Sequence, residues 1–335
     1  MRGPLTPARL VGSLLLLGAL LVATLLVCAG IGASSAGWSD LIQGGDGAVT
    51  ILRLRLPRLI LAAIAGAALG SAGAVFQAVL RNPLADPYIL GVSGGAALGA
   101  FAVTAAGLTA MAPFWPLRQA AAFLGAILTV LFIFLLSSVG GRVASYPMLL
   151  IGVVTNTVYL ALIMFIQTIV ELTRLHGLRI WMIGSIPIEG YDVLTPLAVV
   201  TAAGVFAISL LGRDLNLLSA GEDAARSLGV GVERSRILLV GTASLVTAAA
   251  VAVTGPIGFV GLIVPHVARI FFGPDHRLLA PAAALCGAIF LAAADTVART
   301  ALAPTELPVG VITAMAGGPF FLWLYRRQRG RTYFE

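Results

Sequence analysis

One short motif in the sequence has the residue types and spacing of a catalytic nucleophile. Gly91-Val-Ser93-Gly-Gly95 fits the G-x-S-x-G pattern, in which a sharp strand-to-helix turn exposes the serine and a histidine accepts its proton. Here the motif stands in an apolar, Gly/Ala-rich segment that favours a helix. His266 is the one histidine inside an apolar segment, and the adjacent Pro265 indicates a helix end. We therefore do not expect an intramembrane hydrolase.

The basic residues exclude a second kind of chemistry. All 21 of them are arginines, whereas a Walker A loop needs a lysine to reach the nucleotide phosphates. An ordinary ATP site therefore cannot come from this chain, and any ATP-driven activity requires a separate ATPase subunit. Cys28 and Cys286 lie in apolar runs, where a free cysteine behaves as a small hydrophobic residue, and the sequence has no metal-ligand spacing. We expect no catalytic residue, metal or cofactor.

The composition is typical of a membrane protein. Hydrophobic residues make up 59% of the chain and charged residues only 10%, against about 25% charged residues in soluble domains. A bilayer-spanning helix needs about 20 apolar residues, and the connections between the apolar runs are too short for a soluble domain. The sequence predicts an all-α polytopic membrane protein with a single transmembrane domain over residues 1–335. Its ten predicted spans are residues 10–31, 56–80, 91–110, 119–139, 146–169, 193–212, 236–254, 257–272, 278–295 and 308–325.

The arginines also predict the orientation in the membrane. With the N-terminus in the cytoplasm, ten spans return the C-terminus there, and 14 of the 21 arginines lie inside against 7 outside, as the positive-inside rule favours. We therefore expect a multi-pass protein of the cytoplasmic (inner) membrane with both termini cytoplasmic. The net charge of +7 is then a topology signal, and we expect no nucleic acid partner. The basic tail 326–335 is interpreted as a cytoplasmic anchor, with contact to anionic membrane lipid as the alternative.

The longest polar connection, residues 213–236, predicts a short ordered helix on the cytoplasmic side. Ser219 and Glu222 have the spacing of a capping box, in which each side chain satisfies a free backbone amide at the helix start. Gly229 is well placed to end a helix of two or three turns. Such a segment is too polar to enter lipid and too ordered to be a slack linker. Its residues alone are also consistent with a surface helix that has no partner.

Two helix breaks predict an internal repeat. One apolar run ends at Asn82-Pro83 and another at Thr254-Gly255-Pro256, and each is followed by a short apolar segment. With ten spans, the first break falls on the cytoplasmic side and the second on the outer side. Inverted-topology repeats give this pattern, and broken helices at matching positions often border a transport pathway. Chance recurrence of Gly and Pro along this chain is the alternative.

Five stretches in order carry a family resemblance: RLPR at residues 55–58, RNPLADPYILG at 81–91, DAARSLG at 223–229, GPIGFVGLIVPHVAR at 255–269 and LPVGVITAMAGGPFF at 307–321. Together they resemble the FecCD/BtuC-like family, the permease subunits of binding-protein-dependent ABC importers for iron-siderophore, haem or cobalamin. The resemblance implies a type II ABC importer permease fold with about ten transmembrane helices and inverted-topology repeats. It also implies ATP-driven import of a metal chelate, with a second copy of the chain, two ATPase subunits and a periplasmic substrate-binding protein as partners. The sequence does not name the chelate.

The resemblance implies a role for the polar connection. Asp223, Ala224 and Ala225, followed by Gly229, are similar to the EAA-x3-G segment by which importer permeases contact the ATPase, with Asp in place of Glu. By this resemblance, the short helix would sit in a groove on the ATPase and transmit its closure. Together with the two capping-box residues, these positions form the predicted ATPase-coupling site.

Three arginines are the candidates for docking the binding protein. Arg55, Arg58 and Arg299 lie on the predicted outer side, against the positive-inside trend. They resemble the arginines that, in this family, receive acidic residues on the two lobes of the binding protein. Guanidinium groups suit such bidentate carboxylate recognition. Head-group anchoring is the alternative for all three, and Asp295, at helical spacing, could instead satisfy Arg299.

The polar residues inside the predicted spans bear on the mechanism of transport. Asn156 and Thr157 are candidates for the translocation pathway, because the fifth span of the family flanks the central path; a hydrogen bond to a neighbouring helix is the alternative. An ion-coupled secondary transporter is the alternative function, since it could share inverted repeats and broken helices. It would be expected to carry an ionisable relay in mid-membrane, and the sequence reveals none.

Overall fold

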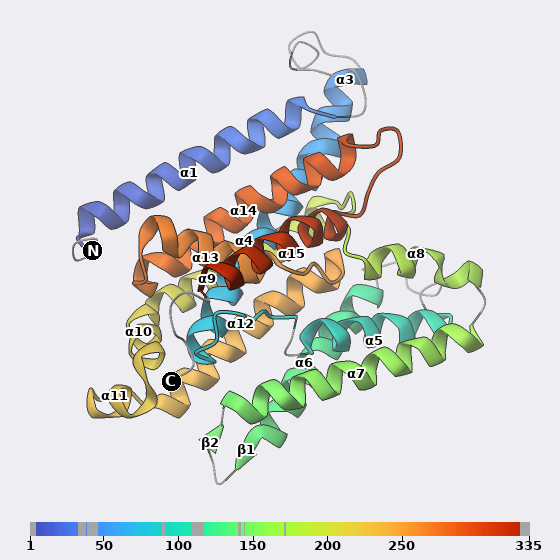
Figure 1. Ribbon diagram of the computed structural model, residues 1–335. Coiled ribbons are helices and arrows are strands. Elements are labelled where there is room, and N and C mark those ends of the chain that lie inside the picture. Colours follow the sequence, from blue (N-terminus) through green and yellow to red (C-terminus); the bar gives the residue numbers. More distant parts are fainter. Residues whose placement is uncertain are drawn as a thin grey trace.

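In the computed structural model, the chain folds into a bundle of helices (Figure 1). The structure describes residues 5–32, 38, 46–88, 91–108, 117–139, 142–143, 145–170 and 172–328. Its elements are α1 (Pro7–Gly30), α3 (Asp46–Val49), the π-helix η1 (Thr50–Arg55), α4 (Leu56–Val79), α5 (Val92–Ala105), α6 (Leu117–Ser137), β1 (Ser138–Val139), β2 (Arg142–Val143), α7 (Ser145–Ile169), α8 (Leu172–Met182), α9 (Tyr191–Leu210), α10 (Gly212–Ala220), α11 (Glu222–Ser227), α12 (Val232–Thr254), α13 (Val260–Phe272), α14 (His276–Thr300) and α15 (Val309–Gln328).

The lengths and hydropathies of the helices fit a membrane protein. Seven helices in the described part of the chain are long and apolar enough to cross a membrane, and three shorter apolar helices, α5, α13 and α15, accompany them. These helices coincide in order with the ten predicted spans. The all-α prediction is confirmed except for β1 and β2, two antiparallel strands of two residues each. How many helices cross the bilayer stays a prediction.

Helix α4 is the centre of the packing. It contacts α12, α13 and α14 (Figure 1), and most of its side chains are buried. A Cβ atom added to Gly66 would lie 2.1 Å from the Gly287 carbonyl oxygen on α14, and one added to Gly73 would lie 2.0 Å from the Gly261 carbonyl oxygen on α13. The helices therefore touch backbone to backbone, which small residues permit in membrane helices. Gln77 adds a polar contact, because its Nε2 donates to the Gly261 oxygen at 3.2 Å.

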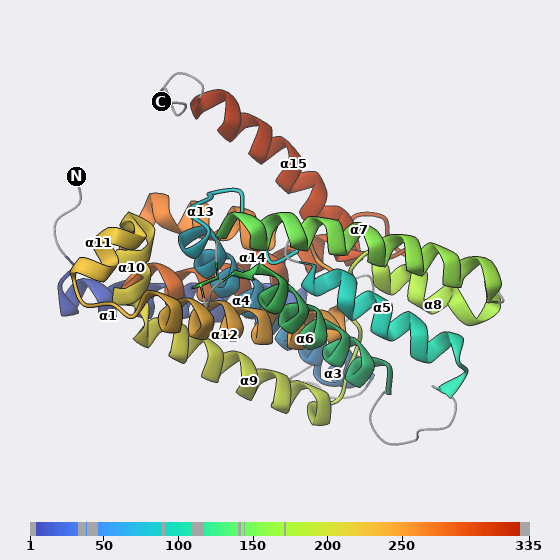
Figure 2. The same ribbon diagram turned by 90° about the horizontal axis from the view of Figure 1, so that it is seen from below.

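A second group of helices packs beside this centre. Helices α5, α6 and α7 lie together, and α5 approaches α6 so closely that a Cβ atom on Gly95 would be 2.6 Å from the Gly125 carbonyl oxygen. Helices α6 and α7 turn many large apolar side chains outward, as helices that face lipid do. Helix α15 contacts α13 and α14, and its C-terminal part extends away from the other helices (Figure 2).

Both predicted helix breaks are present. Helices α4 and α12 end before the predicted prolines, and the short helices α5 and α13 follow. Each short helix begins after a residue with left-handed backbone, Gly91 at φ 73° and Phe259 at φ 69°. The sequence places the two connections at opposite membrane surfaces, but in the structure they meet, because the Asp86 side chain accepts a hydrogen bond from the Phe259 N–H. The inverted repeat itself stays a prediction.

The backbone contact between α4 and α13 predicts that Gly73→Ala destabilises the fold. The added methyl group would overlap the Gly261 backbone, and overpacking of this kind typically lowers the free energy of unfolding by about 1–3 kcal/mol. The thermal unfolding midpoint in detergent measures the effect. Gly241→Ala on α12 is the control, since no atom lies within 4 Å of its added Cβ. Equal midpoints for the two variants would contradict the prediction.

Candidate functional site

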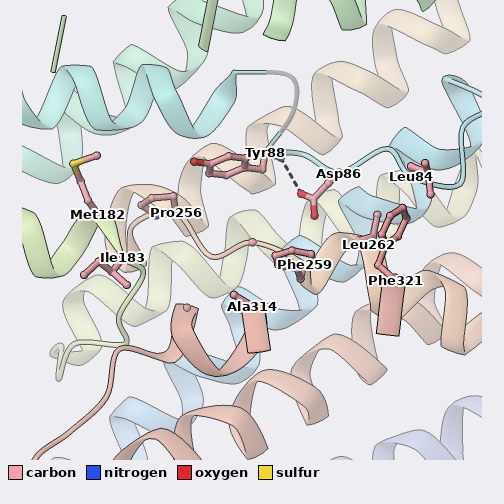
Figure 3. A pocket seen from close by; sticks show the side chains of 12 residues that line it. Leu84, Asp86, Tyr88, Met182, Ile183, Pro256, Phe259, Leu262, Ala314 and Phe321 are labelled. Atoms are coloured by element: carbon pink, nitrogen blue, oxygen red, sulfur yellow. Dashed lines mark hydrogen bonds between the residues drawn. The ribbon is translucent and has the colours of Figure 1, made fainter. Parts of the chain in front are cut away.

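A cavity of about 550 Å³ lies where the two helix breaks meet (Figure 3). Its walls come from the α4–α5 connection, the α12–α13 connection, the end of α8, the start of α13, and α15. The lining is almost entirely apolar, with a single carboxylate. The lining residues are Leu84, Asp86, Tyr88, Met182, Ile183, Pro256, Gly258, Phe259, Leu262, Gly310, Ala314 and Phe321.

Asp86 is the carboxylate of this cavity. Its side chain is 8% exposed, and its Oδ1 accepts a hydrogen bond from the Tyr88 N–H at 2.9 Å (Figure 3). A second bond, from the Phe259 N–H, joins it to the other connection. Asp86 lies between α4 and α5, outside the apolar helices, and burial raises its pKa to about 6. The sequence shows no ionisable group within the predicted spans, and Asp86, which lies in a connection between two of them, adds a buried carboxylate at the cavity.

The predicted docking residues Arg58 and Arg299 share one carboxylate. The Arg58 Nη2 donates to Asp295 Oδ1 at 3.0 Å, and the Arg299 Nε donates to Asp295 Oδ2 at 3.1 Å. Asp295 is fully buried, whereas the Arg58 side chain is 11% exposed. The Arg58 Nη1 also reaches Glu306, a half-exposed residue, at 2.7 Å. Asp295 therefore pairs with Arg299, as the alternative to docking expects, and it pairs with Arg58 as well.

Arg55, the third candidate for docking, is buried. It ends the π-helix η1 and is 5% exposed, and its Nη1 donates to the Ala29 carbonyl oxygen at the end of α1 at 3.1 Å. Its charge lies close enough to Arg299 for the two to repel each other electrostatically. We call Arg55, Arg58, Asp295, Arg299 and Glu306 the arginine cluster. Only Arg58 and Glu306 give it an outward-facing part.

The predicted coupling segment forms two short helices and not one. Gly221, at φ 135°, separates α10 from α11. The capping-box prediction was wrong: Ser219 lies in the last turn of α10, where its Oγ donates to the Asn216 carbonyl oxygen at 2.7 Å. Gly221 is the N-cap of α11, and no side chain caps that helix. The break at Gly221 turns the chain, so Ser219 cannot reach the free amides of α11.

The predicted end of the coupling helix is confirmed. Gly229 has a φ of +83°, its N–H donates to the Arg226 carbonyl oxygen at 3.0 Å, and the Val230 N–H donates to the Ala225 carbonyl oxygen at 3.0 Å. This pair of bonds is the Schellman motif, in which glycine adopts the left-handed conformation at no steric cost. Ala225 is buried, whereas Ala224 and its neighbour Asp223 are exposed. The helix is therefore anchored on one face and open on the other.

Glu222 binds arginines instead of capping a helix. Its carboxylate accepts from the Arg226 Nη2 at 3.3 Å and from Arg236, and it lies 3.7 Å from the Arg81 Nη2. Arg236 is 2% exposed and also pairs with Glu233. We call this group the Glu222 cluster. It joins α11 to α12 and to the connection that follows α4.

Asn216 ties helix α10 to the start of α14. Its Nδ2 donates to Asp275 Oδ1 at 2.8 Å, and its Oδ1 accepts from the His276 N–H at 2.8 Å. Asp275 is the N-cap of α14 and also pairs with Arg277 at 2.6 Å, which holds the pKa of Asp275 at about 2. The segment therefore has ordered contacts at both of its helices.

The two pathway candidates lie on α7, away from the cavity. Asn156 is half-buried and faces α5, since a Cβ atom on Gly94 would be 2.1 Å from its Oδ1. Thr157 is exposed, and its hydroxyl donates back to the Val153 carbonyl oxygen at 3.0 Å. Neither residue lines the cavity. In the described residues, no cluster of three or more His, Cys, Asp or Glu side chains could hold a metal ion.

Comparison with known proteins identifies the family. The model of the FecCD transport family matches residues 20–327. The chain belongs to the FecCD transport family. This confirms the resemblance seen in the five sequence stretches. A solved structure described as an inward-facing metal-chelate type ABC transporter is similar to this FecCD family chain, with a TM-score of 0.83 and 30% identity over 95% of this chain and 99% of that one.

Two relatives illustrate the family. The hemin transport system permease protein HmuU of Yersinia pestis is 39% identical, covering 98% of both chains. The cobalamin import system permease protein BtuC of Halobacterium salinarum is 43% identical, covering 84% of this FecCD family chain and 75% of the relative. Such permeases are transport components of ABC importers, which work with ATPase and binding-protein partners, and are not enzymes. The family and the apolar helices together indicate a multi-pass inner-membrane protein.

The pKa of Asp86 predicts how the stability of this FecCD family chain depends on pH. Because burial raises this pKa from 3.8 to about 6, the folded chain keeps a proton that the unfolded chain releases between these values. The free energy of unfolding should therefore fall as the pH rises from about 4 to about 6, by on the order of 3 kcal/mol, and then level off.

Thermal unfolding in detergent between pH 4 and 8 measures this dependence. Asp86→Asn keeps an oxygen that can accept from the Tyr88 N–H, but its side chain cannot titrate. The stability of this variant should therefore not fall between about pH 4 and pH 6. The same pH profile in both proteins would show that another group causes it.

Proposed function

We propose that this chain is the permease subunit of an ATP-driven importer that carries a metal chelate of the iron-siderophore, haem or cobalamin class into the cytoplasm. Residues 1–335 act as one transmembrane domain with both termini in the cytoplasm, a cytoplasmic coupling segment at 213–236 and a basic cytoplasmic tail at 326–335. The observation that carries the proposal is α11, a short helix that is anchored through the buried Ala225 and exposes Asp223 and Ala224 of the coupling motif.

The exposed face of α11 fits a protein partner. Asp223 is fully exposed, and Leu228, just after the helix, is 61% exposed. An exposed leucine in a polar, ordered segment costs hydration free energy unless a partner covers it. Since the chain has no lysine for a Walker A loop, ATP hydrolysis belongs to two separate ATPase subunits, and this face is where each copy of the permease would bind one of them.

The translocation pathway would lie between two copies of the chain. Helix α7 exposes large apolar side chains, which a second copy as well as lipid could cover. Asn156 and Thr157 on this helix would then flank a central path, and the cavity at the helix breaks would open toward it. The named cargoes of the two relatives, haemin and cobalamin, support the chelate class. The binding protein would select among chelates.

The arginine cluster would receive the binding protein on the opposite side from α11. Arg58 and Glu306 form its outward-facing part. A carboxylate of a partner can take the place of Glu306 on Arg58, because Glu306 is half exposed, while the buried Asp295 cannot leave. Arg55 and Arg299 would contribute mainly positive potential, which steers association.

The first test is recovery of the ATPase. The tagged chain, purified from native membranes in mild detergent, should bring down a Walker A ATPase, identified by mass spectrometry. Leu228→Asp should reduce this recovery about ten-fold, because a charge would be buried in the contact. Leu302→Asp is the matched control. Leu302 is 59% exposed and lies just after the C-terminal end of α14, whereas the start of that helix is the end tied to α10.

Other outcomes of this test separate the candidate functions. If both variants recover the ATPase fully, α11 is not the contact. If the wild-type chain comes down alone and transports in liposomes without ATP, the proposal fails in favour of an ion-coupled secondary transporter. The buried Asp86 would then be its ionisable group.

The second test concerns docking. If a partner carboxylate replaces Glu306, then Glu306→Gln removes an internal competitor, and the binding protein should bind about two- to five-fold more tightly at low salt. Arg58→Gln should weaken binding. Binding is measured with the permease in nanodiscs at two salt concentrations. Unchanged affinity in both variants would show that this cluster serves only the fold.

A further inference from the structure

Two residues in the described part of the chain are non-glycine residues with a positive φ, Arg81 at 48° and Phe259 at 69°. Arg81 lies at the start of the α4–α5 connection and Phe259 at the end of the α12–α13 connection, and both connections line the cavity. Arg81 follows Leu80, the C-cap residue of α4; its N–H donates to the Ala78 carbonyl oxygen at 3.2 Å, and the Asn82 N–H donates to the Gln77 carbonyl oxygen at 3.1 Å. This is the same helix-ending motif that Gly229 forms, but with arginine at the position that favours glycine. Such a conformation costs free energy in a residue other than glycine, and the contacts around the residue must offset it.

The Arg81 side chain reaches the coupling segment. Its Nη2 lies 3.7 Å from the Oε1 of Glu222, the first residue of α11. Glu222 is in turn held by Arg236, which is 2% exposed, and by Arg226. The carboxylate is therefore fixed on the α11–α12 side, and Arg81 is the group that connects it to the end of α4.

On its C-terminal side, Arg81 leads into the α4–α5 connection, which several hydrogen bonds hold in place. Asn82 Oδ1 accepts from the Leu84 N–H at 2.9 Å, and Asp86 accepts from the N–H groups of Tyr88 and Phe259. The Phe259 ring in turn covers Gly317 on α15, since a Cβ atom there would lie 2.3 Å from it. A shift of Arg81 would therefore reach both walls of the cavity within a few residues.

We propose that the Arg81–Glu222 ion pair passes movement of α11 to the α4–α5 connection, so that Arg81 is a positioning residue for the cavity. This inference rests on the proposed function, in which α11 binds an ATPase. A half-exposed ion pair suits the role, because it contributes little to the fold and can shorten or break as α11 moves. Coupling requires such a contact, one whose strength differs between two states.

The α4–α13 contact through Gln77 is the competing route. The Arg269 Nη2 donates to Gln77 Oε1 at 3.3 Å, and Gln77 Nε2 donates to the Gly261 oxygen. These bonds join two helices whose backbones already touch, and they do not reach α11. They hold the bundle together, whereas Arg81 spans from the bundle to the exposed segment.

The test uses Arg81→Gly, which removes the ion pair and relieves the backbone strain, so that a loss of coupling cannot be ascribed to unfolding. Leu84→Cys, in a chain with Cys28→Ala and Cys286→Ala, reports on the cavity wall through its rate of labelling by N-ethylmaleimide. The labelling is measured in the complex with the co-purifying ATPase, with and without ATP and vanadate.

With Arg81 present, trapping by ATP and vanadate should change the labelling rate at least about five-fold. Arg81→Gly should abolish this change while the ATPase still co-purifies and hydrolyses ATP. Arg81→Lys, which keeps the charge, should restore part of it. Arg277→Ala is the control, because Arg277 also forms a partly exposed ion pair, with Asp275, but lies outside α11 and does not pair with Glu222, and it should keep the change.

Each contrary outcome has its own meaning. A full labelling change in Arg81→Gly overturns the inference and leaves the proposed function standing. Loss of the change in Arg277→Ala as well overturns it too, since the effect would then not be specific to the Arg81–Glu222 pair. If no ATPase co-purifies with the chain that retains Arg81, the proposed function fails and the inference fails with it.

Discussion

Direct backbone contact between α4 and its neighbours α13 and α14 determines where the other parts of the molecule can lie. With glycine at the crossing points, no side chain separates these helices, and they pack as one body around the buried α4. Its 24 residues give a helix about 36 Å long, a little more than the thickness of the hydrocarbon layer. The charged groups therefore gather at its two ends: the arginine cluster where α4 begins and the Glu222 cluster where it stops.

The irregular segments obey a second constraint of the membrane. Backbone groups away from water need partners within the protein, and the two connections that follow α4 and α12 obtain them from each other. Asp86 accepts amide hydrogens from both, which accounts for a buried carboxylate in an otherwise apolar wall. The cavity is the space left where two non-helical segments meet and cannot pack as densely as helices.

The sequence predicted the parts of this structure that depend on local patterns. Apolar runs located the ten apolar helices, proline and glycine marked both breaks, and Gly229 ended the coupling helix as expected. The spacing of Ser219 and Glu222 misled, because a capping box competes with other partners for the same carboxylate. The Glu222 carboxylate pairs instead with the buried Arg236 and with the nearby Arg226. An arginine binds a carboxylate more strongly than a backbone amide does.

Contacts between distant parts of the chain were beyond local patterns. Arg58 and Asp295 are 237 residues apart, and nothing near either one signals the other. The spacing of Asp295 and Arg299, four residues along one helix, was the single readable clue to the arginine cluster. The meeting of Asp86 with Phe259 depends on two connections folding back among the helices, so no local pattern points to a carboxylate at the cavity.

The glycine crossings have a mechanical consequence. Helices joined by backbone contact cannot slide along one another, so α4, α13 and α14 would move as one body that carries both ends of α4 with it. The arginine cluster, proposed to meet the binding protein, and the Glu222 cluster, proposed to meet the ATPase, lie at these two ends. Binding of either partner would therefore affect binding of the other through α4. Linkage makes such an effect symmetric: by whatever factor the inner partner changes the affinity for the outer one, the outer partner changes the affinity for the inner one by the same factor.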